Sequence, residues 1–349
     1  MLDAETKNKL YQKIKKGLHE MYGEVPNIFV KQRLQEEWLW FKKANVLVTI
    51  ALLNDIVDRF KLMHINYSPR YSCNASLILY LLGISRINPL PPHYNCPICH
   101  NVIWDKFSKC SLDLKKNKLC KFDESIMKID GFDIPWQTWF LNEENTFNVS
   151  LKGKDFDKLI RILKELRIEC DLGYEKYGGG KCKIIETNNI VFWFNLSDKL
   201  ESLELKLDAS ELESSLLKTK QYVQKVMPEL KAEITSFADV IAIMGILRSS
   251  YIKDSKLRVL FNTLKVKPSE IIACREDLYN YYMSNRSEES EAVKEMNNVR
   301  KGIHQSSILS VATKNTIKDK WMISLCEDVL YLPSKTEIIE DIVFLSNEQ

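Results

Sequence analysis

The chain has 349 residues, of which 45% are hydrophobic and 28% charged, and its formal net charge is +3. This composition is typical of a soluble globular protein, and the net charge is too small to indicate nucleic-acid binding by itself. A membrane span is excluded, because the longest apolar run covers only residues 46–53. The odd number of nine cysteines and the charged first residues predict a cytoplasmic protein with reduced thiols and no signal peptide.

The first elements are predicted to be helical. Residues 4–45 should form two helices, since Leu10 and Ile14 recur at helical spacing and Gly23 interrupts the pattern. The apolar segment 46–62 fits either a helix or a strand. The length of the chain leaves room for two or three subdomains.

A turn-rich segment with one arginine comes before a short apolar helix at residues 77–82. Ser72 or Asn74 is expected to cap this helix, and Arg70 lies on the same side of it in sequence. Free N–H groups beside an arginine favour an anion, most naturally a phosphate. The alternative is an ordinary capped core helix with a solvated arginine.

The next segment carries a resemblance to a known family. Residues 83–99 read Gly-Ile-Ser-Arg-Ile-Asn-Pro-Leu-Pro-Pro-His-Tyr-Asn-Cys-Pro-Ile-Cys, and residues 130–135 read Asp-Gly-Phe-Asp-Ile-Pro. Both resemble the replicative DNA polymerase III alpha subunit of the PolC type. The resemblance covers about residues 8–150, weakly 200–210, and 220–333. In that family a Gly-Ser-rich loop with one arginine binds the incoming triphosphate, which implies nucleotide contacts from three residues here: Arg70, Ser72 and Ser76.

The resemblance implies an α/β (α+β) fold, with a polymerase beta-like palm built on a mixed sheet, a zinc-knuckle insertion and helical fingers. The corresponding domains are 1–92 for the N-terminal part of the palm with the remnant of the nucleotide loop, 93–130 for the knuckle-like insertion, 131–210 for the shortened remainder of the palm, and 211–349 for the fingers-like region.

Cys96 and Cys99 have the spacing of half a zinc knuckle. The resemblance places the other half at Cys120 and Asp123, where one thiolate of the family has become a carboxylate. A structural zinc with these four ligands is chemically sound, because carboxylate oxygen also ligates zinc. A metal-free loop with buried thiols is the alternative. Three neighbours are further candidates for the fourth ligand: His93, His100 and Cys110.

A basic run overlaps this region, and it either lines a phosphate backbone or forms a solvated loop. Its members are Lys106, Lys109, Lys115, Lys116, Lys118 and Lys121.

The carboxylates that polymerases need for two metal ions are missing from their expected place. The resembled family supplies two of them in Pro-Asp-x-Asp-Leu, where this chain has Phe-Asn-Val-Ser-Leu at residues 147–151. Neither Asn148 nor Ser150 carries the negative charge that Mg²⁺ requires of its ligands.

Three other aspartates are candidates for relocated ligands. Asp155 and Asp157 form an Asp-x-Asp pair, but they open an amphipathic helix whose first turn favours acids in any case. Asp208 follows a Leu-Lys-Leu strand and resembles the third carboxylate of the family. Alone it cannot assemble a two-metal site, so Mg²⁺ is expected only if the chain is catalytic.

Further departures affect the nucleotide site. The glycines of the family's loop are replaced by Ser68, Tyr71 and Asn74, and the Pro-Lys-x-His contact reads Pro-Ser-Lys-Thr at residues 333–336. If the geometry of the fingers is preserved, three residues would face DNA or nucleotide: Arg275, Arg300 and Lys301. The alternative is that they are surface charges at helix ends.

The leading hypothesis is a catalytically inactive PolC-like remnant that binds DNA or a replication protein, modulates replication, and is carried by a mobile element. A working metal-dependent DNA nucleotidyltransferase with relocated carboxylates is the second hypothesis, and a zinc-stabilised protein-interaction module is the third. The sequence identifies neither the partner nor the oligomeric state.

Overall fold

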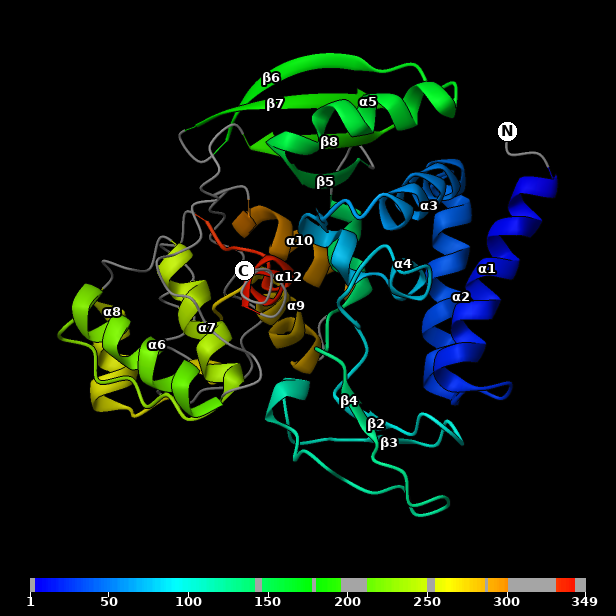
Figure 1. The fold of residues 1–349 in the computed structure, drawn as a ribbon. Helices are drawn as coiled ribbons and strands as arrows, with labels where there is room; N and C mark the ends of the chain where they lie inside the picture. Colours follow the sequence, from blue (N-terminus) through cyan, green and yellow to red (C-terminus); the bar gives the residue numbers. More distant parts are fainter. Residues whose placement is uncertain are drawn as a thin grey trace. The chain divides into compact units, whose positions relative to one another are not determined.

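A computed structural model describes residues 4–141, 146–177, 180–195, 212–249, 255–285, 288–300 and 331–342. The chain divides into two compact units that alternate along the sequence (Figure 1). The first unit consists of Met1–Asp105, Lys116–Gly131 and Asn142–Ser202. The second consists of Lys106–Lys115, Phe132–Leu141 and Leu203–Gln349. Because the boundaries fall inside the basic run, Lys106, Lys109 and Lys115 belong to the second unit and the other three lysines to the first.

The first unit begins with helices α1 (Ala4–Tyr22), α2 (Ile28–Lys43) and α3 (Leu47–Leu62). The prediction of two helices before residue 46 is confirmed, and the ambiguous segment after it is a helix. Asn27 caps α2 through a hydrogen bond from the Phe29 amide. A short 3₁₀ turn (Tyr71–Ala75) and α4 (Leu77–Leu81) follow.

The main sheet of the first unit has five strands in the order β1-β5-β8-β7-β6. The strands are β1 (Tyr67–Pro69), β5 (Phe147–Lys152), β6 (Asp171–Tyr177), β7 (Gly180–Thr187) and β8 (Ile190–Asn195). β5 and β8 are parallel, and the other neighbours are antiparallel, so the sheet is mixed. Helix α5 (Phe156–Glu165) follows β5 and lies along one face of the sheet (Figure 1), where Phe156 packs against Phe194.

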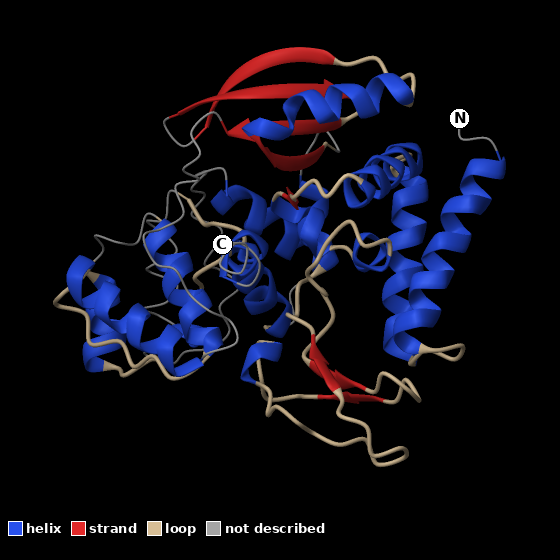
Figure 2. Ribbon diagram, viewed as in Figure 1, coloured by secondary structure: helices blue, strands red, loops and turns tan. Residues whose placement is uncertain are grey.

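A second, small sheet has the order β3-β2-β4 and is antiparallel throughout. Its strands are β2 (His93–Asn95), β3 (Val102–Trp104) and β4 (Lys128–Asp130) (Figure 2). Two loops connect these strands, one between β2 and β3 and one between β3 and β4. The first contains Cys96 and Cys99, and the second contains Cys110 and Cys120. The fold class is therefore mixed α/β, with a five-stranded mixed sheet and a small sheet.

The described elements of the second unit are all helical. They are the 3₁₀ turns Ser111–Asp113, Trp136–Leu141 and Pro268–Glu270, the π-helical turn Val259–Thr263, and the helices α6 (Leu212–Val226), α7 (Phe237–Arg248), α8 (Lys256–Arg258), α9 (Arg275–Ser284), α10 (Glu289–Arg300) and α12 (Lys335–Glu340). Ser236 and Asp239 form a capping box at the start of α7. Within the described part of the chain, no helix is both long and apolar enough to cross a bilayer.

Candidate metal centre and nucleotide site

Four potential ligand groups converge beside the small sheet. One atom from each of Cys96, Cys99, Cys120 and Asp123 lies within 4.8 Å of the others. The Cys96 sulfur is 3.1 Å from Asp123 Oδ2, and the Cys99 and Cys120 sulfurs are 3.5 Å apart. The structure thus brings together the four residues that the sequence singled out, and the cluster could bind a metal such as zinc.

The two turns that carry these residues share one backbone geometry. The Cys96 amide donates to the carbonyl five residues on (3.0 Å), and the His100 amide donates back to the Cys96 carbonyl (3.1 Å). The second turn repeats both bonds, from the amides of Cys120 (2.8 Å) and Glu124 (3.1 Å). His100 and Glu124 also share a left-handed φ of 57°, which is uncommon for residues with a side chain. The turn that ends in Asp123 therefore has the same backbone geometry as the turn that ends in Cys99.

Hydrogen bonds around the cluster orient its ligand atoms. The amides of Ile98 and Cys99 donate to the Cys96 sulfur, each at 3.3 Å. The Ser125 hydroxyl and amide donate to Asp123 Oδ1 at 2.6 and 3.0 Å, which leaves Oδ2 toward the sulfurs. The bonds from Ser125 hold the pKa of Asp123 well below its usual range, whereas the Asp123 carboxylate raises the pKa of Cys99 to about 12.

The donor set fits zinc. Three sulfurs and one carboxylate oxygen make the four ligands of a tetrahedral site, and thiolates favour zinc over Mg²⁺ or Ca²⁺. Four protein ligands leave no open position, so the ion would hold the two turns together rather than activate a substrate.

The alternative fourth ligands lie outside this cluster. The imidazole of His93 contacts Tyr22 Oη at 3.3 Å and the Pro91 carbonyl at 2.7 Å. His100 directs Nδ1 to the Met21 carbonyl, 3.2 Å away. Cys110 belongs to the second unit and is buried. None of the three joins the group of converging ligand atoms.

The helix that follows the candidate phosphate loop is capped by Ser76, and the expectation of Ser72 or Asn74 was wrong. The Leu79 amide donates to Ser76 Oγ at 3.2 Å. Asn74 is buried, and its side chain bonds the Pro69 carbonyl (2.8 Å) and the Ser85 hydroxyl (2.6 Å) instead. The side chain of Ser72 lies outside those that the structure describes.

A buried carboxylate occupies the start of α4. Glu37 of α2 is fully buried and accepts the amides of Leu77 and Ile78, both at 3.0 Å. It also accepts the Ser76 hydroxyl at 2.8 Å and pairs with Arg33. The donors that were expected to be free for a phosphate are therefore already bonded to an anion of the protein. Sequence reasoning missed Glu37, although its place on the face that buries Val30 and Phe41 was a visible signal.

Neutral side chains occupy the place on β5 where the resembled family has carboxylates. The Trp193 indole on β8 donates to Asn148 Oδ1 at 2.8 Å. The Arg70 guanidinium lies over the Trp193 ring, 5.4 Å from its centroid, and the Arg70 amide bonds the Asn148 carbonyl at 2.8 Å. Ser150 Oγ is buried and has no hydrogen-bond partner among the described residues. Arg70 and Ser76 thus have contacts within the protein, and their predicted role in nucleotide binding stays a prediction.

The candidate relocated carboxylates do not form a described cluster. Asp155 precedes the first turn of α5, is buried, and pairs with Lys158 at 2.7 Å. Asp157 lies in the first turn of that helix and is exposed. Asp208 lies outside the described residues. Among the residues that are described, the cysteine cluster is the one group of three or more potential ligands.

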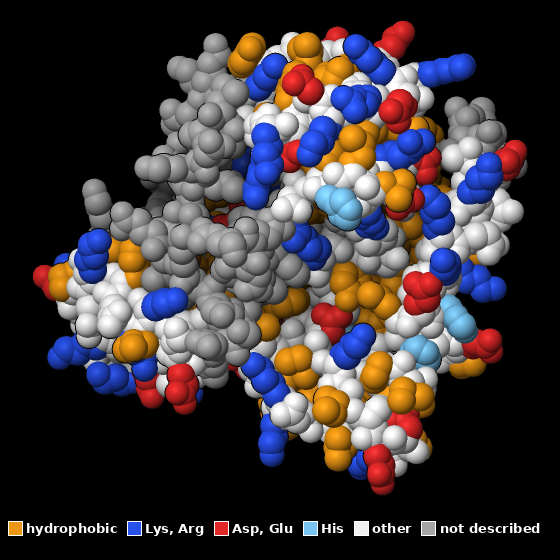
Figure 3. Space-filling view, viewed as in Figure 1, with side chains coloured by type: hydrophobic (Ala, Val, Ile, Leu, Met, Phe, Trp, Pro, Cys, Tyr) orange, Lys and Arg blue, Asp and Glu red, His pale blue; other side chains and the backbone are white. Residues whose placement is uncertain are grey.

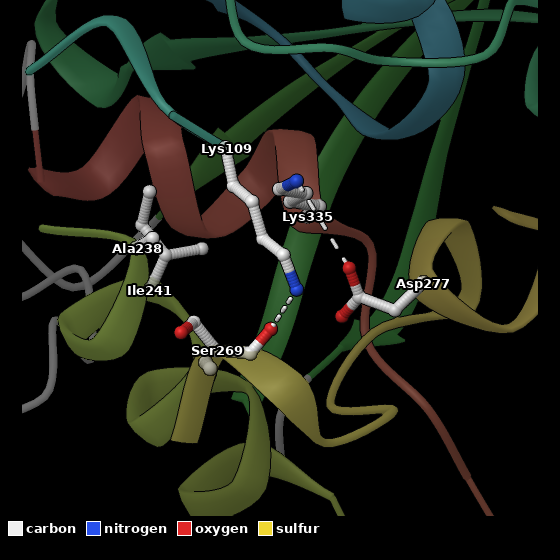
Figure 4. Close-up of a pocket in the computed structure, with 7 residues that line it drawn as sticks. Lys109, Ala238, Ile241, Ser269, Asp277 and Lys335 are labelled. Carbon is white, nitrogen blue, oxygen red and sulfur yellow. Dashed lines mark hydrogen bonds and ion pairs between the residues drawn. The ribbon is translucent and has the colours of Figure 1, made fainter. Parts of the chain in front are cut away.

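The candidate contacts of the second unit are partly buried. Arg275 begins α9, is 4% exposed, and donates from Nε to Glu276 at 3.3 Å. Lys335 lies 3.9 Å from Asp277 and, with Lys109, lines a cavity of about 20 Å³, room for one water molecule (Figure 4). The side chain of Arg300 and all of Lys301 lie outside the described part.

Comparisons with known proteins identify the class. The family model described as "Bacterial DNA polymerase III alpha NTPase domain" matches residues 8–177. The PolC-type DNA polymerase III of Thermotoga maritima is 22% identical over 442 aligned positions, which cover 93% of this chain and 32% of that protein. Shorter matches reach 32% identity over 123 residues in Caldanaerobacter subterraneus and 30% over 138 residues in Bacillus subtilis, covering 35% and 39% of this chain and 9% of each relative.

The chain is a distant relative of PolC-type DNA polymerase III over most of its length, which confirms the resemblance read from the motifs. It spans about a third of the length of the relatives that it matches most extensively.

Proposed function

We propose that this protein is a catalytically inactive PolC-like chain that binds DNA, and through it modulates DNA replication. In this proposal the five-stranded sheet is the palm, the helices of the second unit are the fingers, and a structural zinc holds the knuckle insertion. The relation to PolC supports DNA as the partner, and a replication protein is the alternative partner.

The observation that carries the proposal is the neutral face of β5. A two-metal polymerase site requires carboxylates that hold Mg²⁺ against its own hydration. Here Asn148 is bonded to Trp193 and Ser150 offers only a neutral hydroxyl, while a guanidinium lies over the same indole. A cation of the protein beside neutral ligands disfavours a metal ion at this place.

The test measures binding and catalysis on the same DNA. The protein is given a labelled primer–template with all four nucleotides and Mg²⁺ or Mn²⁺, and binding is followed by fluorescence anisotropy. We expect salt-dependent binding without primer extension, since phosphate contacts release counterions.

Two outcomes would contradict the proposal. Absence of binding to any DNA would remove the DNA-binding function. Extension that is lost in Asp208→Asn, or in Asp155→Asn with Asp157→Asn, would show that the carboxylates were relocated and that the chain is an enzyme. Asp171→Asn on β6 is a control for the loss of a single aspartate elsewhere on the sheet.

A further inference from the structure

The two metal-binding turns carry exposed apolar side chains at equivalent positions. Ile98 and Phe122 are each the third residue of their Cys-x-x-Cys or Cys-x-x-Asp turn, and they are 66% and 76% exposed. Leu119 and Ile126 pair across the base of the second turn and are 56% and 59% exposed. We call these four residues the knuckle surface. Figure 3 shows exposed hydrophobic side chains over the part of the first unit that contains β2–β4.

Lysines surround the second turn. Lys116, Lys121 and Lys128 are exposed, and Lys118 lies over the Tyr94 ring with Nζ 4.1 Å from its centroid. The acids of the same stretch are fewer. Asp123 belongs to the ligand cluster, Glu124 is exposed, and Asp130 accepts hydrogen bonds from two neutral donors, Tyr80 (2.6 Å) and Asn88 (2.7 Å).

A bound Zn²⁺ would offset two of the four ligand charges. The four lysines then balance the remaining two charges together with Glu124 and Asp130, so the lysines around the knuckle surface are not outweighed by acids. Large exposed apolar groups set among lysines suit unpaired bases and phosphates. They suit a protein partner less well, because lysine is depleted from protein–protein interfaces.

We propose that the knuckle surface binds single-stranded DNA. Phe122 stacks on a base, Ile98 packs against its neighbour, and Lys116, Lys121 and Lys128 contact phosphates. This inference rests on the proposed DNA binding and deepens it, because it assigns the unpaired strand to one surface of the first unit.

The test uses the zinc-loaded full chain and a fluorescein-labelled oligothymidylate, with a blunt duplex as the second ligand. We expect Phe122→Ala to weaken binding to the single strand about tenfold, the size of one lost stacking contact, and to leave duplex binding unchanged. Leu172→Ala is the matched control, because Leu172 is 61% exposed on β6 of the same unit and outside the knuckle surface.

A second variant tests the phosphate contacts without touching the apolar residues. Lys121→Gln with Lys128→Gln should reduce the slope of log K against log salt by about 1.4, or about 0.7 for each lost contact. Lys15→Gln on α1, which removes one exposed lysine elsewhere, should leave the slope unchanged. Zinc content is measured for every variant, and the lysine variant carries the test if Phe122→Ala loses the metal.

The outcomes separate this inference from the proposed function. If primer–template binding persists while both knuckle variants bind the single strand like wild type, the inference is overturned and the proposed function stands. If wild type binds neither single-stranded nor duplex DNA, both fail. A third outcome also overturns the inference. If the lysine variant keeps the wild-type salt slope and Phe122→Ala captures a replication protein more weakly than wild type does, the surface binds a protein partner.

Discussion

The candidate metal centre and the candidate nucleotide site differ in how their polar groups are satisfied. At the metal centre, three thiols and a carboxylate face one another within 4.8 Å. At the nucleotide site, a buried carboxylate accepts the amides that begin α4, and an indole bonds the amide side chain on β5. Both regions gather polar side chains from separate segments of the chain. Only the first consists entirely of potential metal ligands.

This difference bears on which of the two regions can take up an external ligand. Thiols and a carboxylate that converge become a cluster of negative charges when they ionise. A bound metal ion compensates these charges and so stabilises the cluster. Donors and acceptors that already bond one another are less available to an external ligand. The cysteine cluster therefore presents groups that a metal ion could bind, whereas the described polar groups at the candidate nucleotide site are largely bonded within the protein.

The largest expected effect is loss of the metal. Removal by a strong chelator, or Cys120→Ser, should abolish one equivalent of bound zinc and unfold the two turns, because structural zinc contributes about 10–16 kcal/mol of binding free energy in small zinc modules. Metal content by mass spectrometry and hydrogen exchange over residues 93–130 check this. The control is Cys170→Ser, which changes a cysteine outside the cluster. Unchanged exchange after chelation would mean that the turns are held without metal.

How much of this the sequence predicts depends on the range of the interactions. The spacing of Cys96, Cys99 and Cys120 is local, and the matching turn made Asp123 the fourth candidate. The role of Glu37 depends on α2 packing against α4, some 40 residues away in sequence, and no local pattern specifies that contact.

The cap of α4 shows the same limit. Three polar residues precede the helix within one turn, and tertiary contacts decide among them. Asn74 bonds Ser85, eleven residues on, so Ser76 is left to cap. In the same way the parallel pairing of β5 with β8 brings the Trp193 indole to Asn148, a contact between segments some 45 residues apart.

The next effect concerns the Glu37 carboxylate at the start of α4. Glu37→Ala should lower the free energy of unfolding by about 3–5 kcal/mol, because Arg33 Nε and two buried amides lose the acceptor that Glu37 provides. Urea unfolding of the purified variant measures this, with Glu36→Ala as the control at the exposed neighbouring position. A change below about 1 kcal/mol would contradict the structural role assigned to the Glu37 carboxylate.

A smaller effect is expected at the hydrogen bonds around the metal. Ser125→Ala removes the hydroxyl that holds Asp123 Oδ1 but leaves the amide bond in place. Metal affinity should fall about 10–100-fold, as is usual when an outer partner of a ligand is lost. Competition with a chromophoric chelator measures the affinity, and Ser108→Ala, which changes a serine outside both turns, is the control. An affinity equal to wild type would mean that Asp123 is not a ligand.

The smallest effect is expected on the neutral face of β5. Trp193→Phe keeps an aromatic ring under Arg70 but removes the indole donor, so Asn148 Oδ1 loses its bond of 2.8 Å. The free energy of unfolding should fall by about 1 kcal/mol, the net value of one hydrogen bond. Urea unfolding followed by circular dichroism measures it, and Trp38→Phe, which removes an indole from α2, is the control. Mn²⁺ should not stabilise either variant, because no carboxylate is introduced. Stabilisation of Trp193→Phe by Mn²⁺ would show that Asn148 and Ser150 bind a metal once the indole is gone, and the two regions would then differ in occupancy rather than in kind.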